Sequence, residues 1–182
     1  MKIVCISGKA RHGKDTLAGF LKDCFEERDE RVLVAHYGDL VKYVCKTFFG
    51  WDGKKDERGR TLLQHVGTDT IRAKDQAFWV DFVMDILGFF PDEWDWVLIP
   101  DCRFPDEITR MYRLRSDTTQ VYNIRINREN FQTDLTEEQQ AHPSETALDD
   151  YAFELTITNR GTLDDLRKTA EWIADYYFRA PR

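Results

Sequence analysis

The sequence predicts an α/β protein in which a five-stranded parallel sheet is covered by helices on both faces, giving three α/β/α layers. Short apolar runs of strand length recur along the chain, and segments with apolar residues at helical spacing lie between them. Strands and helices that alternate in this way form right-handed crossovers, so the sheet is parallel and both of its faces are covered. The expected strands are Lys2–Ser7, Arg31–His36, Trp94–Pro100, Gln120–Ile126 and Phe153–Thr158.

A glycine-punctuated loop joins the first strand to the first expected helix, which runs from Lys14 to about Arg28. The loop has the spacing G-x-x-x-x-G-K-x-T and consists of Gly8, Lys9, Ala10, Arg11, His12, Gly13, Lys14, Asp15 and Thr16. Its glycines let several N–H groups turn toward one point, and the helix N-terminus behind them completes a cradle for an anion. Lys14 adds a positive charge for the outer phosphates. A chance glycine-rich turn is the alternative, but the strand before the loop and the helix after it favour a phosphate-binding loop.

Length, charge and cysteine content limit the function classes. With 182 residues the chain suits a single domain, residues 1–182, with a full core. The net charge of −7 argues against nucleic acid as the main partner, and no apolar run approaches a membrane span. Scattered cysteines without metal-ligand spacing suit a reduced, cytoplasmic enzyme. The oligomeric state is not determined by the sequence, and a homodimer is compatible with it.

Two segments between strands are longer than a simple crossover requires. Residues 38–92 contain three helical patterns in succession, one of them an apolar stripe that ends at Phe48 and Phe49, and we expect this region to bind the second substrate. Residues 127–147 are polar, and we expect a long loop that covers the site as a lid. After the last strand, Thr162 predicts an N-cap for the final helix, with Asp165 as its capping partner.

Asp101 follows the apolar run of the third strand in the sequence. A carboxylate at the carboxyl end of a buried strand lies where Mg²⁺ is held opposite a phosphate loop, directly or through water. The alternative is a strand that simply stops at a polar residue. The phosphate loop favours the metal site, with the hydroxyl of Thr16 as a second contact.

Further motifs occur in a characteristic order. They are Gly67-Thr68-Asp69 with Arg72 and Trp79, Asp101-Cys102-Arg103-Phe104-Pro105-Asp106-Glu107, His142-Pro143-Ser144-Glu145 with Leu148-Asp149, and Asn159-Arg160-Gly161. With the Lys14-Asp15 pair, they resemble those of a family of phosphate-loop kinases. This family includes phage and bacterial deoxynucleoside monophosphate kinases and animal-type phosphomevalonate kinases. Phe104 favours the nucleotide branch, because the mevalonate enzymes have a second arginine there.

The resemblance implies the P-loop nucleoside monophosphate kinase-like fold, ATP and Mg²⁺ as cofactors, and a deoxynucleoside monophosphate as the small-molecule acceptor. A phosphomevalonate kinase and a non-catalytic nucleotide-binding protein are the alternatives. The sequence contains no N-K-x-D or T-K-x-D run for reading guanine, which argues against a GTPase switch. It departs from the family in having His12 where serine is usual, and in a lid that carries only Arg128, with Arg125 at the strand end.

We assign candidate roles on this basis. Lys14, Arg103 and Arg128 would act on the transferring group, and the whole loop from Gly8 to Thr16 would hold the phosphates of ATP. Arg72 and Arg103 would bind the acceptor's phosphate, because a guanidinium fork matches two phosphate oxygens; a surface salt bridge is the alternative for each. Asp15 would face the acceptor or an ordered water, and Trp79 would line the acceptor pocket or belong to the core. Thr16 and Asp101 would hold the metal, whereas His36, His65 and His142 are interpreted as residues of the fold.

Overall fold

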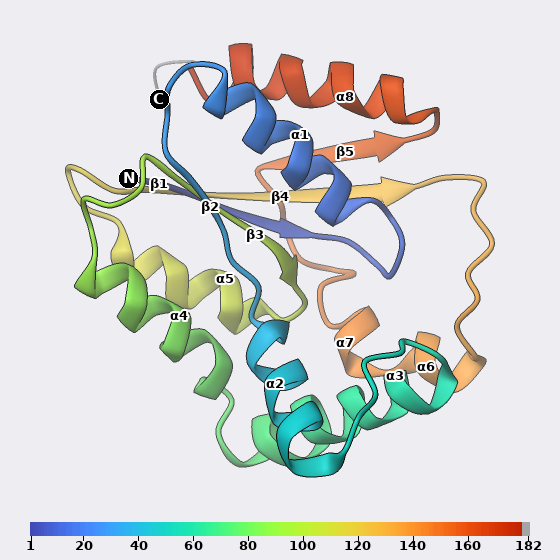
Figure 1. Cartoon of the computed structure of the whole chain (residues 1–182). Coiled ribbons are helices and arrows are strands. Elements are labelled where there is room, and N and C mark those ends of the chain that lie inside the picture. Colours follow the sequence, from blue (N-terminus) through green and yellow to red (C-terminus); the bar gives the residue numbers. More distant parts are fainter. Residues whose placement is uncertain (180–182) are drawn as a thin grey trace.

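The computed structural model describes residues 1–179 and contains the predicted five-stranded parallel sheet. The strands lie in the order β2-β3-β1-β4-β5, and every neighbouring pair is parallel (Figure 1). Their bounds are β1 (Lys2–Ser7), β2 (Val32–Val34), β3 (Trp96–Cys102), β4 (Gln120–Arg128) and β5 (Leu155–Asn159). The central strand β1 is therefore flanked by β3 and β4, and the loop that follows it opens at the middle of the sheet's carboxyl edge.

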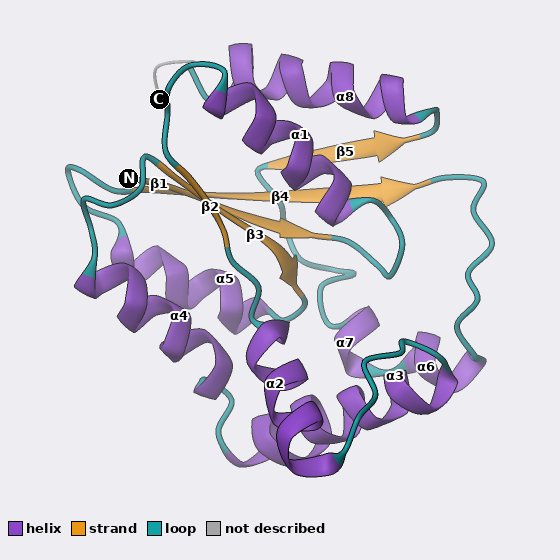
Figure 2. Ribbon diagram, in the orientation of Figure 1, coloured by secondary structure: helices purple, strands orange, loops and turns teal. Residues whose placement is uncertain are grey.

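Helices cover both faces of this sheet, with α1 and α8 on one face and α4 and α5 on the other (Figure 2). The α-helices are α1 (Lys14–Glu26), α2 (Gly38–Phe49), α3 (Glu57–Gln64), α4 (Phe78–Phe89), α5 (Pro105–Met111), α6 (Glu137–Ala141), α7 (Pro143–Thr146) and α8 (Leu163–Trp172). Two π-helical segments, η1 (His65–Arg72) and η3 (Ile173–Tyr177), continue α3 and α8, and a short 3₁₀ turn, η2 (Tyr112–Leu114), follows α5. Thr162 caps α8 and exchanges hydrogen bonds with Asp165, as predicted.

The two layers of core follow from the period-two alternation of side chains in the strands. Val4 and Ile6 of β1 are fully buried against the α1 and α8 side, while Ile3 and Cys5 are fully buried against the α4 and α5 side. Since both faces are covered, the strand is apolar from Ile3 to Ile6, as buried parallel strands are. All four cysteines are buried and free. None of the helices in residues 1–179 is both long and apolar enough to cross a bilayer.

Two segments differ from expectation. The segment 127–147 is not a loop throughout, because β4 extends to Arg128 and the short helices α6 and α7 lie at its far end. A five-residue polar helix has no apolar periodicity to reveal it, and its signal was the capping box of Thr136 and Gln139. In α2, Phe48 and Phe49 are exposed by 71% and 57%, because the end of this helix extends beyond the sheet layer (Figure 1).

Candidate active site

The loop after β1 has the backbone of a phosphate cradle. Gly8 has φ 152°, and a Cβ there would lie 2.4 Å from the backbone oxygen of Ile126, so only glycine fits. Gly13 has φ 104° and closes the loop at the start of α1. Between them, Arg11 adopts φ 60°, an uncommon conformation for a residue with a side chain. Strained backbone of this kind concentrates at functional sites.

Lys14 is buried at the centre of the loop, with 6% of its surface exposed. Its Nζ donates a hydrogen bond to the backbone oxygen of Lys9 at 2.9 Å. Burial, together with the positive charge of Arg103, lowers the pKa of Lys14 to about 8, although Glu145 and Asp15 oppose the shift. The ammonium group is therefore short of compensating negative charge, and it is suited to bind an anion.

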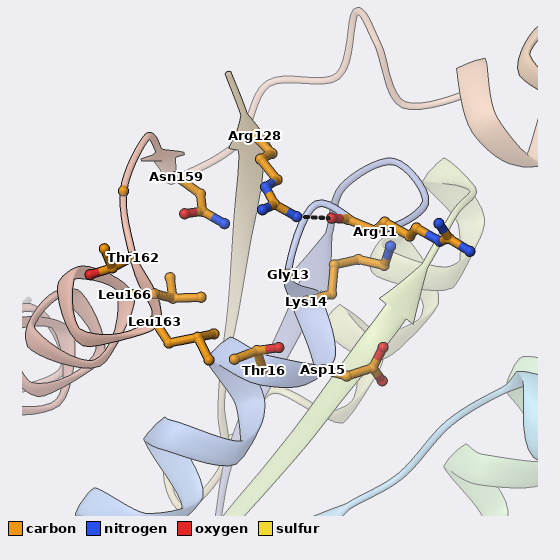
Figure 3. A pocket seen from close by; sticks show the side chains of 11 residues that line it. Arg11, Gly13, Lys14, Asp15, Thr16, Arg128, Asn159, Thr162, Leu163 and Leu166 are labelled. Atoms are coloured by element: carbon orange, nitrogen blue, oxygen red, sulfur yellow. Dashed lines mark hydrogen bonds between the residues drawn. The ribbon is translucent and has the colours of Figure 1, made fainter. Parts of the chain in front are cut away.

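A cavity of about 330 Å³ lies along the loop, between α1 and the turn that joins β5 to α8 (Figure 3). Its lining combines cationic, hydroxyl and amide groups with apolar side chains: Arg11, Gly13, Lys14, Asp15, Thr16, Arg128, Asn159, Gly161, Thr162, Leu163 and Leu166. Asn159 donates a hydrogen bond to the backbone oxygen of His12 at 3.2 Å, which ties the β5–α8 turn to the phosphate loop. The phosphate end and the apolar wall of the cavity suit a nucleotide.

His12 connects the loop to the end of β4, which accounts for a histidine at this position. The Nδ1 atom of His12 accepts a hydrogen bond from the backbone N–H of Arg128 at 3.1 Å. Burial lowers the pKa of His12, which favours the neutral ring that this acceptor role requires. The guanidinium of Arg128 in turn donates to the backbone oxygen of Arg11 at 3.4 Å (Figure 3). Arg128 therefore lies at the rim of the cavity.

Asp101 lies at the carboxyl end of β3 and joins this strand to α2. Its two carboxylate oxygens accept backbone N–H groups, one from Tyr37 at 3.1 Å and one from Gly38 at 2.8 Å. Burial raises the pKa of Asp101 above its usual range, while the Gly38 N–H and the charge of His36 oppose that shift.

The residues at this edge fit a magnesium site that is completed by the ligand. Among the described residues, no group of three or more His, Cys, Asp or Glu side chains is arranged to hold a metal. Mg²⁺ bound with a nucleotide needs only one or two protein oxygens, because water and phosphate supply the rest. Asp101 retains lone pairs beyond its two hydrogen bonds, and the Thr16 hydroxyl has no hydrogen-bond partner within residues 1–179. Both therefore have the donor chemistry that such an ion takes.

Arg103 lies next to the phosphate loop on the side of α5 and α7. Its Nη1 donates to the backbone oxygen of Ser144 at 3.0 Å and pairs with the carboxylate of Glu145. Its own backbone N–H is held by Glu107 at 2.6 Å. Within residues 1–179, the Nε and Nη2 atoms of Arg103 have no partner, so one edge of the guanidinium is free to bind an anion.

Arg72 and Trp79 lie deeper than the other candidates. Arg72 is 7% exposed, pairs with Asp106 and Glu107, and lies over the ring of Phe104 at 3.8 Å. Trp79 is 4% exposed and donates its indole N–H to the backbone oxygen of Gly67 at 2.9 Å. The structure thus places Arg72 beneath the Arg103 loop and Trp79 in the core between the sheet and the helices α4 and α5.

Three residues of the site have partners that the sequence does not indicate. His36, which the sequence predicts to be an ordinary fold residue, follows β2 by two residues and forms a hydrogen bond to Asp15 at 2.9 Å. Glu145 accepts the backbone N–H of Ala10 at 2.8 Å, and Asp149 accepts from Lys9 at 2.9 Å. Both carboxylates belong to motifs that the sequence shows, His142-Pro143-Ser144-Glu145 and Leu148-Asp149, but no local pattern identifies the partner of either.

The fold and this site together define a phosphate-loop phosphotransferase of the α/β class. Residues 39–170 match the family described as deoxynucleotide monophosphate kinase, and the chain belongs to that family. It is therefore a nucleotide-binding kinase. No curated protein sequence matches the chain.

Solved structures of the APS kinase CysC from Mycobacterium tuberculosis are similar in fold. A mutant form matches with a TM-score of 0.52 and 13% identity, covering 92% of each chain. The complex with AMPPNP and APS matches with a TM-score of 0.53 and 11% identity, covering 92% of this chain and 94% of that one. At these identities the likeness concerns the fold alone, and it confirms the predicted P-loop kinase architecture.

Proposed function

We propose that the protein transfers the γ-phosphoryl group of ATP in line to the phosphate of a deoxynucleoside monophosphate. An oxygen of the acceptor phosphate attacks the γ-phosphorus, the bond from that phosphorus to the β–γ bridging oxygen breaks, and ADP leaves. The acceptor phosphate is already ionised near pH 7, so no side chain has to remove a proton. The protein's task is to position the two phosphates and to stabilise negative charge between them.

One observation carries this proposal: the phosphate loop borders the cavity and is also linked to Arg103. Lys14 lines the 330 Å³ cavity together with Arg128 and Thr162. Arg103 is not part of that lining, but it pairs with Glu145, whose carboxylate also accepts the backbone N–H of Ala10 in the loop. A two-substrate kinase needs such an arrangement, because the transferring group must pass from a donor to an acceptor across one central cation.

On the donor side, the backbone of Gly8–Thr16 and the ammonium of Lys14 would hold the phosphates of ATP, with the nucleoside in the cavity. Arg128, at the rim, would close over the transferring group. Thr16 and Asp101 would hold Mg²⁺ with its water shell. When bound, Mg²⁺ supplies charge neutralisation to the β- and γ-phosphates.

On the acceptor side, the free edge of Arg103 would bind the acceptor phosphate, since two parallel N–H groups match two phosphate oxygens. Asp15 would face the acceptor, and its bond to His36 supports a fixed orientation for that carboxylate. We assign Arg72 and Trp79 to the wall behind this pocket, where Arg72 adds positive charge from beneath. The four free, buried cysteines support a reducing compartment such as the cytoplasm.

A coupled ADP-release assay tests the proposal. ATP is offered with each dNMP, each NMP and phosphomevalonate in turn, and we expect at least one dNMP to give the highest kcat/KM. Lys14→Ala should abolish turnover while the circular dichroism spectrum stays native. Lys168→Ala, which removes a lysine from the exposed face of α8, is the matched control and should retain wild-type turnover. A preference for phosphomevalonate, or ADP release that no acceptor stimulates, would overturn the assignment.

A further inference from the structure

Two arginines from distant parts of the chain converge on a single carboxylate oxygen. The Oδ2 atom of Asp134 lies 2.7 Å from Nη2 of Arg11 and 3.0 Å from Nη1 of Arg60. Arg11 belongs to the phosphate loop, Arg60 to α3, and Asp134 to the connection between β4 and α6. The pair of guanidinium groups therefore already forms an anion site, which a carboxylate of the protein itself occupies.

The three side chains are not equally accessible. The side chain of Arg60 is 20% exposed, whereas those of Asp134 and Arg11 are 42% and 55% exposed. Arg60 also lies on a helix whose start is capped by Asp56, which accepts the N–H of Gly59 at 2.8 Å. Arg60 is thus the fixed member of the cluster, and Asp134, on a connecting segment, is the member that a competing anion can displace.

The position of Arg11 relates this cluster to the phosphates. Arg11 lies in the middle of the loop and borders the 330 Å³ cavity, and its side chain extends past Lys14, away from Asn159 and Thr162 (Figure 3). Because both arginines contact the same oxygen of Asp134, a single anion can bridge the guanidinium groups of Arg60 and Arg11. A phosphate oxygen placed where Oδ2 of Asp134 lies would receive charge-assisted hydrogen bonds from both guanidinium groups.

We propose that Arg60 and Arg11 form a clamp for the transferring phosphoryl group, and that Asp134 occupies this clamp as an internal counter-anion until the nucleotide arrives. The identity of the bound group rests on the proposed kinase function. Arg128 is the only arginine in the lid. The clamp adds the positive charge of two further arginines. Entry of the phosphate exchanges one anion for another, so the two arginines are never left unpaired at a partly buried position.

Charge-neutralising variants of the two partners should have opposite effects. Arg60→Gln should lower kcat at least about 100-fold, since an arginine on the transferring group accounts for large factors in related reactions. Asp134→Asn should raise kcat/KM for ATP about threefold, because the phosphate no longer competes with a carboxylate. Arg58→Gln, on the exposed face of the same helix, is the matched control and should behave as wild type.

Two results would overturn the clamp. If Asp134→Asn loses as much kcat as Arg60→Gln, the contact is an ordinary salt bridge that anchors the lid. If Arg60→Gln is no worse than Arg58→Gln, Arg60 does not touch the transferring group. Either result with an active wild-type enzyme leaves the proposed function intact.

A binding measurement tests the clamp without turnover. Isothermal calorimetry with inorganic tripolyphosphate should give a Kd raised about tenfold in Arg60→Gln and lowered in Asp134→Asn, relative to wild type. If the wild-type protein phosphorylates no acceptor but shows this pattern, the proposed function fails, and Arg60 and Arg11 stand as a clamp for a bound polyphosphate. Equal tripolyphosphate affinities in all three proteins contradict the clamp whatever the activity.

Discussion

The carboxylate of Glu145 accepts a hydrogen bond from the backbone N–H of Ala10, with 2.8 Å between the nitrogen and Oε2. Its other oxygen pairs with the guanidinium of Arg103. With only 6% of its side chain exposed, Glu145 thus links the loop assigned to the donor phosphates to the arginine assigned to the acceptor phosphate. Each side of the site depends on the other for its geometry.

Replacing this carboxylate should therefore affect the acceptor more than ATP. In Glu145→Ala, Arg103 loses the anion that orients its Nη1, and a hydrogen bond to a charged group is worth about 1.5–3 kcal/mol. We expect KM for the dNMP to rise roughly tenfold or more, with a smaller change in KM for ATP. Initial rates over both substrate concentrations measure this.

Asp150→Ala is the matched control for that variant, because Asp150 is exposed and lies five residues away on the same segment. It should keep both KM values of the wild type. Equal increases in the two KM values of Glu145→Ala would contradict the assignment, since a general loss of structure affects both substrates.

The Arg72 cluster should contribute mainly to stability. Burial raises the pKa of Glu107 to about 7, although the N–H of Arg103 and the charge of Arg72 oppose the shift. Removing Arg72 leaves the buried Glu107 and the half-buried Asp106 without their cation, and breaking a buried pair costs about 3–5 kcal/mol. We expect Arg72→Gln to lower the free energy of unfolding in urea by about 3 kcal/mol.

Arg110→Gln provides the comparison for Arg72, because Arg110 pairs with Asp81 at 2.8 Å near the surface. A partly exposed pair is worth about 0–1 kcal/mol, so this variant should unfold nearly as the wild type does. If Arg72→Gln is no less stable than Arg110→Gln, the ion pairs of Arg72 are not structural, and its main role lies with the acceptor.

The alternation of strands and helices, the phosphate loop and the position of Asp101 at the carboxyl end of its strand could be predicted because their signals are local. Buried parallel strands are apolar throughout, a loop glycine precedes a helix, and Thr162 lies three residues before its capping partner. These patterns extend over a few residues, so the order of elements and the carboxyl edge of the sheet follow from them.

The polar contacts between distant residues that complete the site could not be predicted. Glu145 is 135 residues from Ala10, and the contact between them depends on how α7 packs beneath the loop. The same holds for Asp134, which meets Arg60 and Arg11 only because the connection after β4 passes over α3. The periodicity of a sequence indicates which face of an element is buried, but not which polar side chains from other elements meet there.

The pair of His36 and Asp15 should make stability depend on pH. The hydrogen bond to Asp15 raises the pKa of His36 above its usual 6.5, and the same bond lowers the pKa of Asp15 below 3.8. The contribution of His36 is therefore complete below about pH 6.5 and lost as pH rises through the raised pKa. That of Asp15 is present above about pH 3.8 and lost as pH falls through the lowered value.

We expect His36→Gln to be less stable than wild type at pH 5.5 and nearly equal to it at pH 9. The difference should be only about 0.5 kcal/mol, because Asp15 is 77% exposed and exposed pairs are weak. Urea unfolding across this pH range measures it. His65→Gln is the control, since the His65 side chain is 67% exposed and 4.0 Å from Asp69. A constant difference between His36→Gln and wild type would exclude the charged pair.

Lys14 should set the alkaline limit of ATP use. Its pKa is lowered to about 8, first by burial and then by the charge of Arg103. Only the protonated form of Lys14 neutralises the phosphates, and kcat/KM reports the pKa values of the free enzyme. We therefore expect kcat/KM for ATP to fall about tenfold per pH unit above pH 8. In Lys14→Arg the guanidinium stays charged, so the fall in kcat/KM above pH 8, the alkaline limb of the profile, should disappear even though the maximal rate is lower. Lys9→Arg, also in the loop, should retain the limb. A limb that persists in Lys14→Arg would assign the titration to another group.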